Sequence, residues 1–371
     1  MAPAIIRTVK YRCGKPIFMP RPIQANIDMG ALESNLQVAR RATSARIMSV
    51  VKADAYGHGL LRAAEALAAT DGYALLDIRD AVRLRNSGYR QTILLLEGYF
   101  SAEDLPIIAE YDLTCVIHSA EQISMLEAYP ESGTLDVWLK VNSGMNRLGF
   151  APQHVAQTIE QLRRHRVVRD ITLMTHFANA DEARGVAEQL ALFNDVAAPH
   201  RVARSLANSA ALLRYPATQA DWVRPGIMLY GASPFAEVSA QQLGLRPAMT
   251  LSSRIIATQQ LRAGDEVGYG ALFRAERAMR IGIVACGYAD GYPRHAPNGT
   301  STLVDGQRTR TVGRVSMDML YVDLSALPRA AVGSRVVLWG EGMPIEEVAR
   351  AAGTVSYELM CALTPRVRIV T

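Results

Sequence analysis

Lysine, histidine and arginine side chains that can do chemistry stand where short apolar runs of the sequence end. Lys52 follows IMSVV, His176 follows LMT and Arg224 follows WV. A lysine at the end of a buried strand must lose water from its ammonium group, which lowers its pKa and frees a nucleophilic amine. Such an amine can bond covalently to a carbonyl carbon. A lysine whose charge simply reaches solvent, or one paired with Asp54, remains an alternative at this point.

Eight apolar runs between Ala31 and Tyr230 would position these residues. They are 46–52, 73–77, 92–97, 114–118, 135–142, 170–176, 201–206 and 222–224. Stretches with apolar residues three and four apart, at 61–69, 120–128 and 182–195, predict helices between some of them. Eight such units predict an α/β fold, a (β/α)8 barrel of the TIM type. The alternative, a doubly wound open sheet, would need an early GxGxxG turn, which the sequence lacks.

In a barrel of this kind the functional groups gather at the carboxyl ends of the strands. Those ends carry Lys52, Lys140 with Arg147, His176, Ser205 with Asn208 and Ser209, and Arg224.

The sequence pattern changes after Pro247. Short alternating runs such as TLSSRIIATQQL and SRVVLWG are separated by turn signals such as PNGT and VDGQ, with one helical pattern at 344–352. We therefore expect a barrel at 19–245 and a β-rich C-terminal domain at 246–371. Residues 1–18 form a basic N-terminal extension. We expect this extension to lie upstream of a natural start at Met19, and the alternatives are an ordered extension or a targeting segment.

The charge and the cysteines exclude several classes of protein. The formal net charge is +5, but Arg7, Lys10, Arg12 and Lys15 supply four of these charges, so the remaining chain is nearly neutral and nucleic-acid binding is not expected. No run reaches the roughly 20 apolar residues of a membrane span. The four cysteines, Cys13, Cys115, Cys286 and Cys361, are far apart and predict neither disulfides nor a metal site. A reduced cytoplasm fits best.

Residues 50–59, VVKADAYGHG, resemble the segment that holds pyridoxal phosphate in the alanine racemases. Eight further segments resemble that family in its order, and together they extend from Pro20 to the C-terminus. They are 140–150 (KVNSGMNRLGF), 175–181 (THFANAD), 205–212 (SLANSAAL), 223–231 (VRPGIMLYG), 267–270 (VGYG), 287–294 (GYADGYPR), 313–318 (GRVSMD) and 356–363 (SYELMCAL). The main departure from the family is the basic extension.

The resemblance implies a cofactor site. Lys52 would hold pyridoxal phosphate covalently and act as one acid/base, and Arg224 would face the pyridine nitrogen. Because an arginine donates a hydrogen bond without giving up its proton, the ring nitrogen would stay neutral, which favours reprotonation of the substrate carbon over transamination. The phosphate would be bound by the hydroxyls of Tyr56, Ser209 and Tyr357 and by the backbone N–H groups of Gly226 and Ile227.

The resemblance also implies a second base, because racemisation needs proton transfer on both faces of the substrate carbon. This base would be Tyr269 of a partner subunit, with His176 and Arg224 behind it to lower its pKa. Arg147 would bind the substrate carboxylate, oriented by Lys140, which some relatives carry as an N-carbamylated lysine. The backbone of the partner's Met317 would meet the same carboxylate. The entry corridor would be lined by Tyr288, Arg294, Arg314, Asp181 and Asp318, with Tyr288 and Tyr357 as its inner gate.

The implied activity is interconversion of L- and D-alanine by a homodimer with shared active sites, serving either D-alanine supply for the cell wall or alanine breakdown. A racemase of broader specificity that also accepts serine or lysine is an alternative, as is a non-catalytic carrier of pyridoxal phosphate. A decarboxylase of similar architecture is disfavoured by Arg224 and by the absence of a glycine-rich phosphate run. The carrier is disfavoured by VGYG and GRVSMD in the β-rich domain.

Overall fold

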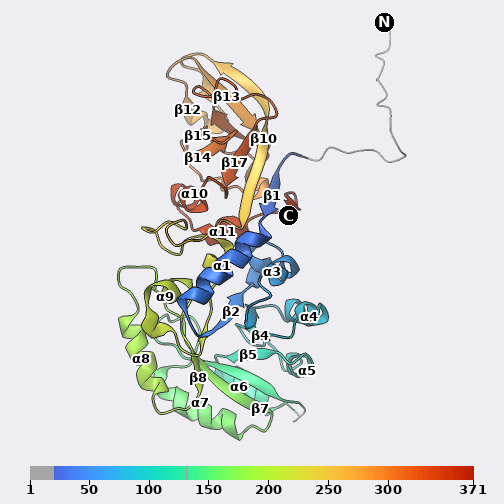
Figure 1. The fold of residues 1–371 in the computed structure, drawn as a ribbon, viewed down its shortest axis with the longest axis vertical. Helices are drawn as coiled ribbons and strands as arrows, with labels where there is room; N and C mark the ends of the chain where they lie inside the picture. The colour runs from blue at the N-terminus through green and yellow to red at the C-terminus, as the bar shows by residue number, and fades with distance from the viewer. Residues whose placement is uncertain (1–20, 130–132) are drawn as a thin grey trace, which may run out of the picture.

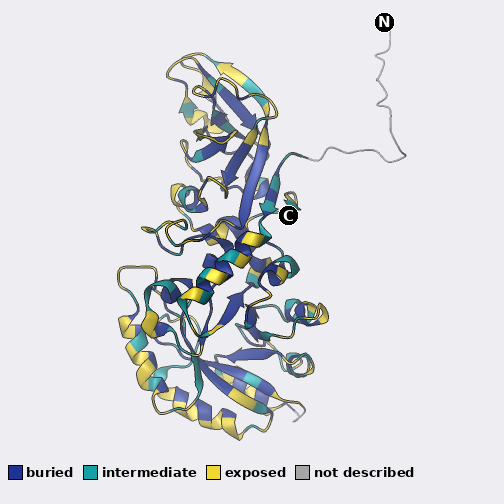
Figure 2. Ribbon diagram, in the orientation of Figure 1, coloured by how far each residue is buried: buried dark blue, intermediate teal, exposed yellow. Residues whose placement is uncertain are grey.

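The computed structural model describes residues 21–129 and 133–371. The extension expected at residues 1–18 lies outside the described residues. Figure 1 shows an elongated molecule with a barrel at one end and a β-rich part at the other. Buried residues fill the interior of both parts, and exposed residues gather on the outer helices (Figure 2).

The barrel is closed and parallel, which confirms the predicted fold. Its strands are β2 (Arg46–Val50), β3 (Gly72–Leu75), β4 (Thr92–Leu95), β5 (Thr114–Ile117), β6 (Leu135–Lys140), β7 (Val168–Met174), β8 (Ala203–Ser205) and β9 (Trp222–Val223). Strand β9 pairs in parallel with β2 and closes the ring. Each of the eight apolar runs overlaps one of these strands, although most strands are shorter than the run that predicted them, and β3 and β7 begin one and two residues before it.

Helices surround the barrel. They are α1 (Met29–Ala42), α3 (Leu60–Ala66), α4 (Ile78–Asn86), α5 (Asp104–Glu110), α6 (Ala120–Glu127), α7 (Pro152–Arg164), α8 (Ala187–Ala197) and α9 (Ser209–Arg214), with a short segment α2 (Lys52–Tyr56). Side chains of Asp28, Asp77, Ser119 and Asn208 cap four of them by accepting a backbone N–H bond. The helix predicted from 182 begins only at Ala187, because Gly185 takes a left-handed φ of 68° that ends the preceding turn.

The C-terminal part is mainly β, as predicted. Its sheet runs in the order β13 (Met279–Val284), β16 (Leu320–Asp323), β15 (Gln307–Val312), β14 (Ser301–Val304), β17 (Arg335–Trp339), β10 (Met249–Leu261), β1 (Gln24–Ile27) and β18 (Arg368–Val370). Strand β10 also pairs with β13, so six of the strands close into a ring. A small ribbon of β11 (Glu266–Val267) and β12 (Phe273–Arg274) and the helices α10 (Ile345–Ala351) and α11 (Ser356–Cys361) complete it.

Strand β1 joins the two parts. It precedes the barrel in sequence but pairs antiparallel with β10 and parallel with β18 in the C-terminal sheet. Helix α1 then leads back to the barrel, where buried Asn35 donates to the carbonyls of Leu229 and Arg246 at 3.0 and 2.8 Å and accepts the Arg246 N–H at 2.8 Å. One cluster of buried apolar residues extends through both parts. No helix of the described residues is long and apolar enough to span a bilayer.

Candidate active site

Four basic side chains lie at the carboxyl end of the barrel. Lys52 follows β2, Lys140 is the last residue of β6, His176 follows β7 and Arg224 directly follows β9. Because all these strands are parallel, their carboxyl ends meet on one face of the barrel. Arg147 joins them from the loop between β6 and α7, since its charge acts on both Lys140 and His176. The structure therefore brings these five sequence-predicted residues together.

The positive charges of this cluster oppose further protonation within it. Burial lowers the pKa of His176 well below its usual value, and the charges of Arg224, Lys140, Arg147 and Lys52 lower it further. Burial and the neighbouring Arg224 and Arg147 lower the pKa of Lys140 to about 8. Burial lowers the pKa of Arg224 to about 10, so this arginine remains protonated at neutral pH. A group of cations of this kind, of which Lys140 and Arg224 are buried, favours an anionic ligand.

The Arg224 guanidinium is held rigidly. It donates from Nη1 to the Ser205 hydroxyl at 2.5 Å, and from Nη2 to the carbonyls of Thr175 and Leu206 at 2.5 and 3.2 Å. The serine was identified from its place at a strand end. The two carbonyls were missed, because backbone acceptors leave no signal in a sequence.

A second group of polar atoms forms a cradle beside these cations. The Ser209 hydroxyl accepts the N–H groups of Gly226 and Met228 at 2.9 and 3.4 Å. A β-carbon on Gly226 would lie 2.7 Å from the Tyr56 hydroxyl oxygen, so a glycine is needed for the two segments to approach. Ile227 begins the 3-10 turn η2 (Ile227–Tyr230) and is buried. Hydroxyls and backbone N–H groups that converge in this way suit a phosphate.

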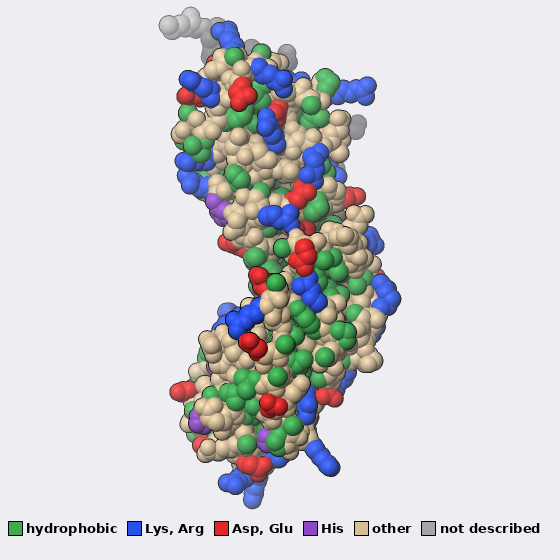
Figure 3. Space-filling view, turned by 90° about the vertical axis from the view of Figure 1, so that its left-hand side faces the viewer, with side chains coloured by type: hydrophobic (Ala, Val, Ile, Leu, Met, Phe, Trp, Pro, Cys, Tyr) green, Lys and Arg blue, Asp and Glu red, His purple; other side chains and the backbone are tan. Residues whose placement is uncertain are grey.

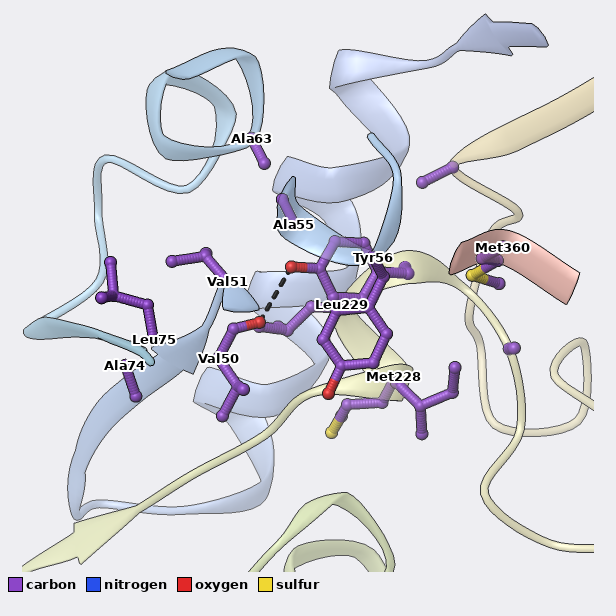
Figure 4. Packing of buried hydrophobic residues seen from close by; sticks show 14 of the residues in the cluster. Val50, Val51, Ala55, Tyr56, Ala63, Ala74, Leu75, Met228, Leu229 and Met360 are labelled. Carbon is purple, nitrogen blue, oxygen red and sulfur yellow. Dashed lines mark hydrogen bonds between the residues drawn. The ribbon is translucent and has the colours of Figure 1, made fainter. Parts of the chain in front are cut away.

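The segment labelled α2 is a left-handed turn. Ala53, Asp54, Ala55 and Tyr56 have φ values of 53, 50, 54 and 53°, and the sequence pattern did not predict this. Each residue costs about 1–2 kcal/mol in this conformation. The turn directs Tyr56 into the barrel end, where its ring lies 4.5 Å from that of Tyr230 and 5.9 Å from that of Tyr357. Figure 4 shows Tyr56 packed with Val50, Met228 and Met360.

Tyr357 and Asp181 lie at the mouth of the same barrel. Tyr357 belongs to α11, which packs against the left-handed turn so closely that a β-carbon on Gly57 would lie 2.4 Å from the Met360 carbonyl oxygen. Burial, followed by the charge of Asp181, raises the pKa of Tyr357. Figure 3 shows a recess on one face of the molecule between the barrel and the β-rich part.

The remaining predicted residues lie on the β-rich part. Tyr269 is 72% exposed in the turn η3 (Tyr269–Ala271), just before β12, which Figure 1 places well away from the barrel. Met317 is 52% exposed, and its carbonyl accepts the N–H of Ala289 at 3.0 Å. Tyr288, in the turn η4 (Tyr288–Asp290), donates its N–H to the Ser316 carbonyl at 3.1 Å. Arg294 is exposed. Arg314 lies beside Gly270 and Asp318 follows Met317.

An ion-pair network that sequence reasoning missed supports these loops. Asp290 is fully buried and pairs with Arg21 and Arg366, each at 3.3 Å. Asp318 pairs with the same two arginines at 3.3 and 2.5 Å. The network therefore connects the loops that carry Tyr288 and Met317 to both ends of the described chain. Arg21 and Asp290 are 269 positions apart, so no local pattern could have indicated their contact.

Comparisons with known proteins agree with this architecture. The family model of the alanine racemase N-terminal domain matches residues 27–234, and that of the C-terminal domain matches residues 248–371. The chain belongs to the alanine racemase family. It is 62% identical to the alanine racemase of Nitrosospira multiformis over 95% of this chain and 100% of the relative.

Solved structures of the family have the same fold. The biosynthetic alanine racemase of Pseudomonas aeruginosa is 47% identical, with a TM-score of 0.92 over 94% of this chain and 99% of that one. The alanine racemase of Acinetobacter baumannii is 38% identical, with a TM-score of 0.89 over the same shares. Members of the family depend on pyridoxal phosphate. The residues of this chain fit that cofactor, because the barrel end offers a lysine, a cluster of cations and the cradle of Tyr56, Ser209 and Gly226.

Proposed function

We propose that this chain interconverts L- and D-alanine with pyridoxal phosphate, and that Lys52 and Tyr269 of two different subunits move the proton on opposite faces of the substrate carbon. The observation that carries the proposal is the cluster of Lys52, Lys140, Arg147, His176 and Arg224 at one end of the barrel of an alanine racemase. When bound, pyridoxal phosphate supplies the electron sink that makes the α-proton of an amino acid removable. The activity itself is that of the family.

The cofactor-binding residues follow from the cradle and the cation cluster. The Lys52 amine would hold the cofactor, and Arg224 would donate to its ring nitrogen. The bonds from Arg224 to Ser205, Thr175 and Leu206 fix its orientation, and a pKa of about 10 keeps its proton in place at neutral pH. The phosphate would be bound by Tyr56, Ser209, Tyr357 and the N–H groups of Gly226 and Ile227.

The substrate carboxylate would be bound by Arg147, whose loop places it near Lys140 and His176. Lys140 is a candidate for N-carbamylation, because burial among cations favours its neutral amine, and a carbamate would turn a repulsive neighbour of Arg147 into an attractive one. The partner's Met317 would offer its backbone to the same carboxylate.

Two copies of the chain would form a homodimer with shared active sites. Tyr269, Leu272, Met317 and Met319 are large apolar side chains exposed on the β-rich part, and a second copy would cover them. Tyr269 stands in a turn remote from the barrel end of its own chain, which supports its acting in the partner. There His176 would hydrogen-bond to it, with Arg224 behind His176, so that the two residues support the proton transfer.

The entry corridor would be formed by Asp181 and Tyr357 of one subunit and by Tyr288, Arg294, Arg314 and Asp318 of the other. Two phenols, Tyr288 and Tyr357, would leave room for little more than a methyl side chain, which favours alanine over serine or lysine. The enzyme would act in the cytoplasm, either to supply D-alanine for the cell wall or to break alanine down, because both roles use the same residues. The barrel domain at 19–245 and the β-rich domain at 246–371 would then be the two contributors to each site.

The test is chiral chromatography of L-alanine, L-serine and L-lysine after incubation with the cofactor-loaded protein. We expect alanine alone to reach an equal mixture of enantiomers. Tyr269→Phe should abolish racemisation while cofactor binding survives, and the matched control Tyr111→Phe, at the end of α5, should retain it. Turnover of serine or lysine would favour the broader racemase, and full activity of Tyr269→Phe would contradict the two-base assignment.

Subunit mixing tests the shared site. Neither Lys52→Ala nor Tyr269→Phe alone should racemise alanine. Heterodimers of the two variants should recover one intact site each, since one site would combine an unchanged Lys52 with an unchanged Tyr269. No recovery in heterodimers of verified composition would contradict the dimer proposed here.

A further inference from the structure

The left-handed turn that follows Lys52 needs support from its surroundings. Four successive residues that are not glycine, Ala53 to Tyr56, adopt positive φ values, a conformation that L-residues avoid. A turn of this kind persists only where neighbouring contacts determine it. Two residues expected to bind the cofactor, Lys52 and Tyr56, stand at its two ends.

His58 provides a side-chain contact to this turn. Its Nδ1 lies 3.0 Å from the carbonyl oxygens of both Ala55 and Tyr56. Because carbonyl oxygens only accept hydrogen bonds, Nδ1 must carry the proton and donate it to both. The ring is fully buried and lies 4.7 Å from the ring of Tyr230, whose hydroxyl donates to the Val50 carbonyl at 2.8 Å. His58 is therefore fixed between the end of β2 and the turn.

The other supports of the turn act at different points. The Asp54 carboxylate accepts the N–H of Leu60 at 2.8 Å, and the Asp54 carbonyl accepts that of Gly59 at 2.9 Å. Arg62 donates to the His58 carbonyl at 2.6 Å. These bonds fasten the turn to the start of α3, whereas the His58 imidazole reaches the carbonyls at the Tyr56 end.

We propose that His58 is a positioning residue for the cofactor site. Its Nδ1–H holds the left-handed turn so that Tyr56 faces Gly226 while Lys52 stays at the end of β2. The inference rests on the proposed function, since it takes Lys52 and Tyr56 to be cofactor-binding residues. Without the Nδ1–H, the Tyr56 hydroxyl would leave the cradle, and both the affinity for pyridoxal phosphate and kcat would fall. KM for alanine would change less, because Arg147 belongs to another loop.

Three substitutions separate the hydrogen bond from the volume of the ring. In His58→Asn the amide nitrogen stands near the position of Nδ1, in His58→Gln it stands near that of Nε2, and His58→Phe has no donor. The matched control is Thr302→Val, which removes a buried bond from a side-chain hydroxyl to the Val337 carbonyl in the β-rich part. Hydrogen exchange of a peptide covering residues 52–60, the apparent Kd for pyridoxal phosphate and the kinetic constants are measured for each.

We expect His58→Phe and His58→Gln to speed exchange of that peptide about tenfold, to weaken cofactor binding and to lower kcat by about tenfold to a hundredfold. His58→Asn should recover most of each loss, and Thr302→Val should leave the peptide unchanged. If His58→Phe does not fold, the contrast between Asn and Gln decides the question.

Unchanged exchange in His58→Gln, or equal losses in Asn and Gln, would overturn the inference. A different result would contradict the proposed function. If Lys52→Ala kept both the visible absorbance of bound cofactor and full racemisation, that function would be wrong, whatever the hydrogen exchange of the His58 variants shows.

Discussion

Tyr56 and Gly226 approach each other so closely that a β-carbon on Gly226 would lie 2.7 Å from the Tyr56 hydroxyl oxygen. The contact joins the turn after β2 to the turn after β9, the two strands that close the barrel. The N–H of Gly226 meanwhile donates to the Ser209 hydroxyl at 2.9 Å. Three chain segments thus meet at the point where the phosphate is expected. They can approach one another because Gly226 has no side chain.

Gly226→Ala should weaken the binding of pyridoxal phosphate. The added β-carbon would collide with the Tyr56 hydroxyl oxygen, which lies 2.7 Å from its position. Overpacking of this kind costs about 1–3 kcal/mol. Cofactor titration by absorbance measures the loss. In a Tyr56→Phe background the oxygen is absent, so the same substitution should cost less, and an equal cost in both backgrounds would contradict the proposed contact.

Lys140 should react with carbon dioxide. Its pKa of about 8 makes the neutral amine far more abundant near neutral pH than in an ordinary lysine, by roughly two orders of magnitude. We expect a carbamate signal in the NMR spectrum of protein supplied with ¹³C-bicarbonate, growing as the pH rises toward 8. Lys140→Arg, which keeps the charge but cannot form the carbamate, should remove the signal. A signal that persists in this variant would assign the carbamate to another lysine.

The fold could be predicted because its signal is repeated. Most barrel strands are short apolar runs, and the parallel strands then place residues such as Lys52 and Arg224 on one face without further information. Strand β1 was not predicted, because QANI has little pattern of its own and its partners in β10 and β18 lie far along the chain. Pairing over such distances depends on the assembled fold.

The interior of the site was less predictable for the same reason. The residues KADAY would suit an ordinary helix, since alanine gives no indication of positive φ, yet the structure forms a left-handed turn there. The carbonyls that hold Arg224 have no side-chain signature. The resemblance of nine segments to one family supplied the expected roles, whereas the contacts that orient these residues required the structure.

Asp290→Asn should destabilise the β-rich part and impair the corridor loops. The carboxylate is fully buried and pairs with Arg21 and Arg366, both partly exposed, so we expect a loss of about 1–3 kcal/mol in the free energy of unfolding. Urea titration measures it. The control, Glu188→Gln on α8, breaks an exposed pair with Arg184, which precedes that helix, and should cost less than about 0.5 kcal/mol. Equal losses of unfolding free energy in the two variants would show that the buried network stabilises the protein no more than an exposed ion pair does.

His58 should make the protein less stable in acid. Burial lowers its pKa to about 4, whereas the unfolded chain binds the same proton near pH 6.5. The unfolded state therefore binds more protons between these values, so the contribution of His58 to stability is complete above pH 6.5 and is lost as the pH falls toward 4, with a slope of up to about 1.4 kcal/mol per pH unit. Urea titrations of the wild type and His58→Asn at about pH 7.5 and about pH 5 isolate this contribution. His176 responds in the same direction and is unchanged in both proteins. We expect the wild type to lose more stability than the variant between the two pH values, and a parallel loss would mean that His58 is already protonated in the folded protein.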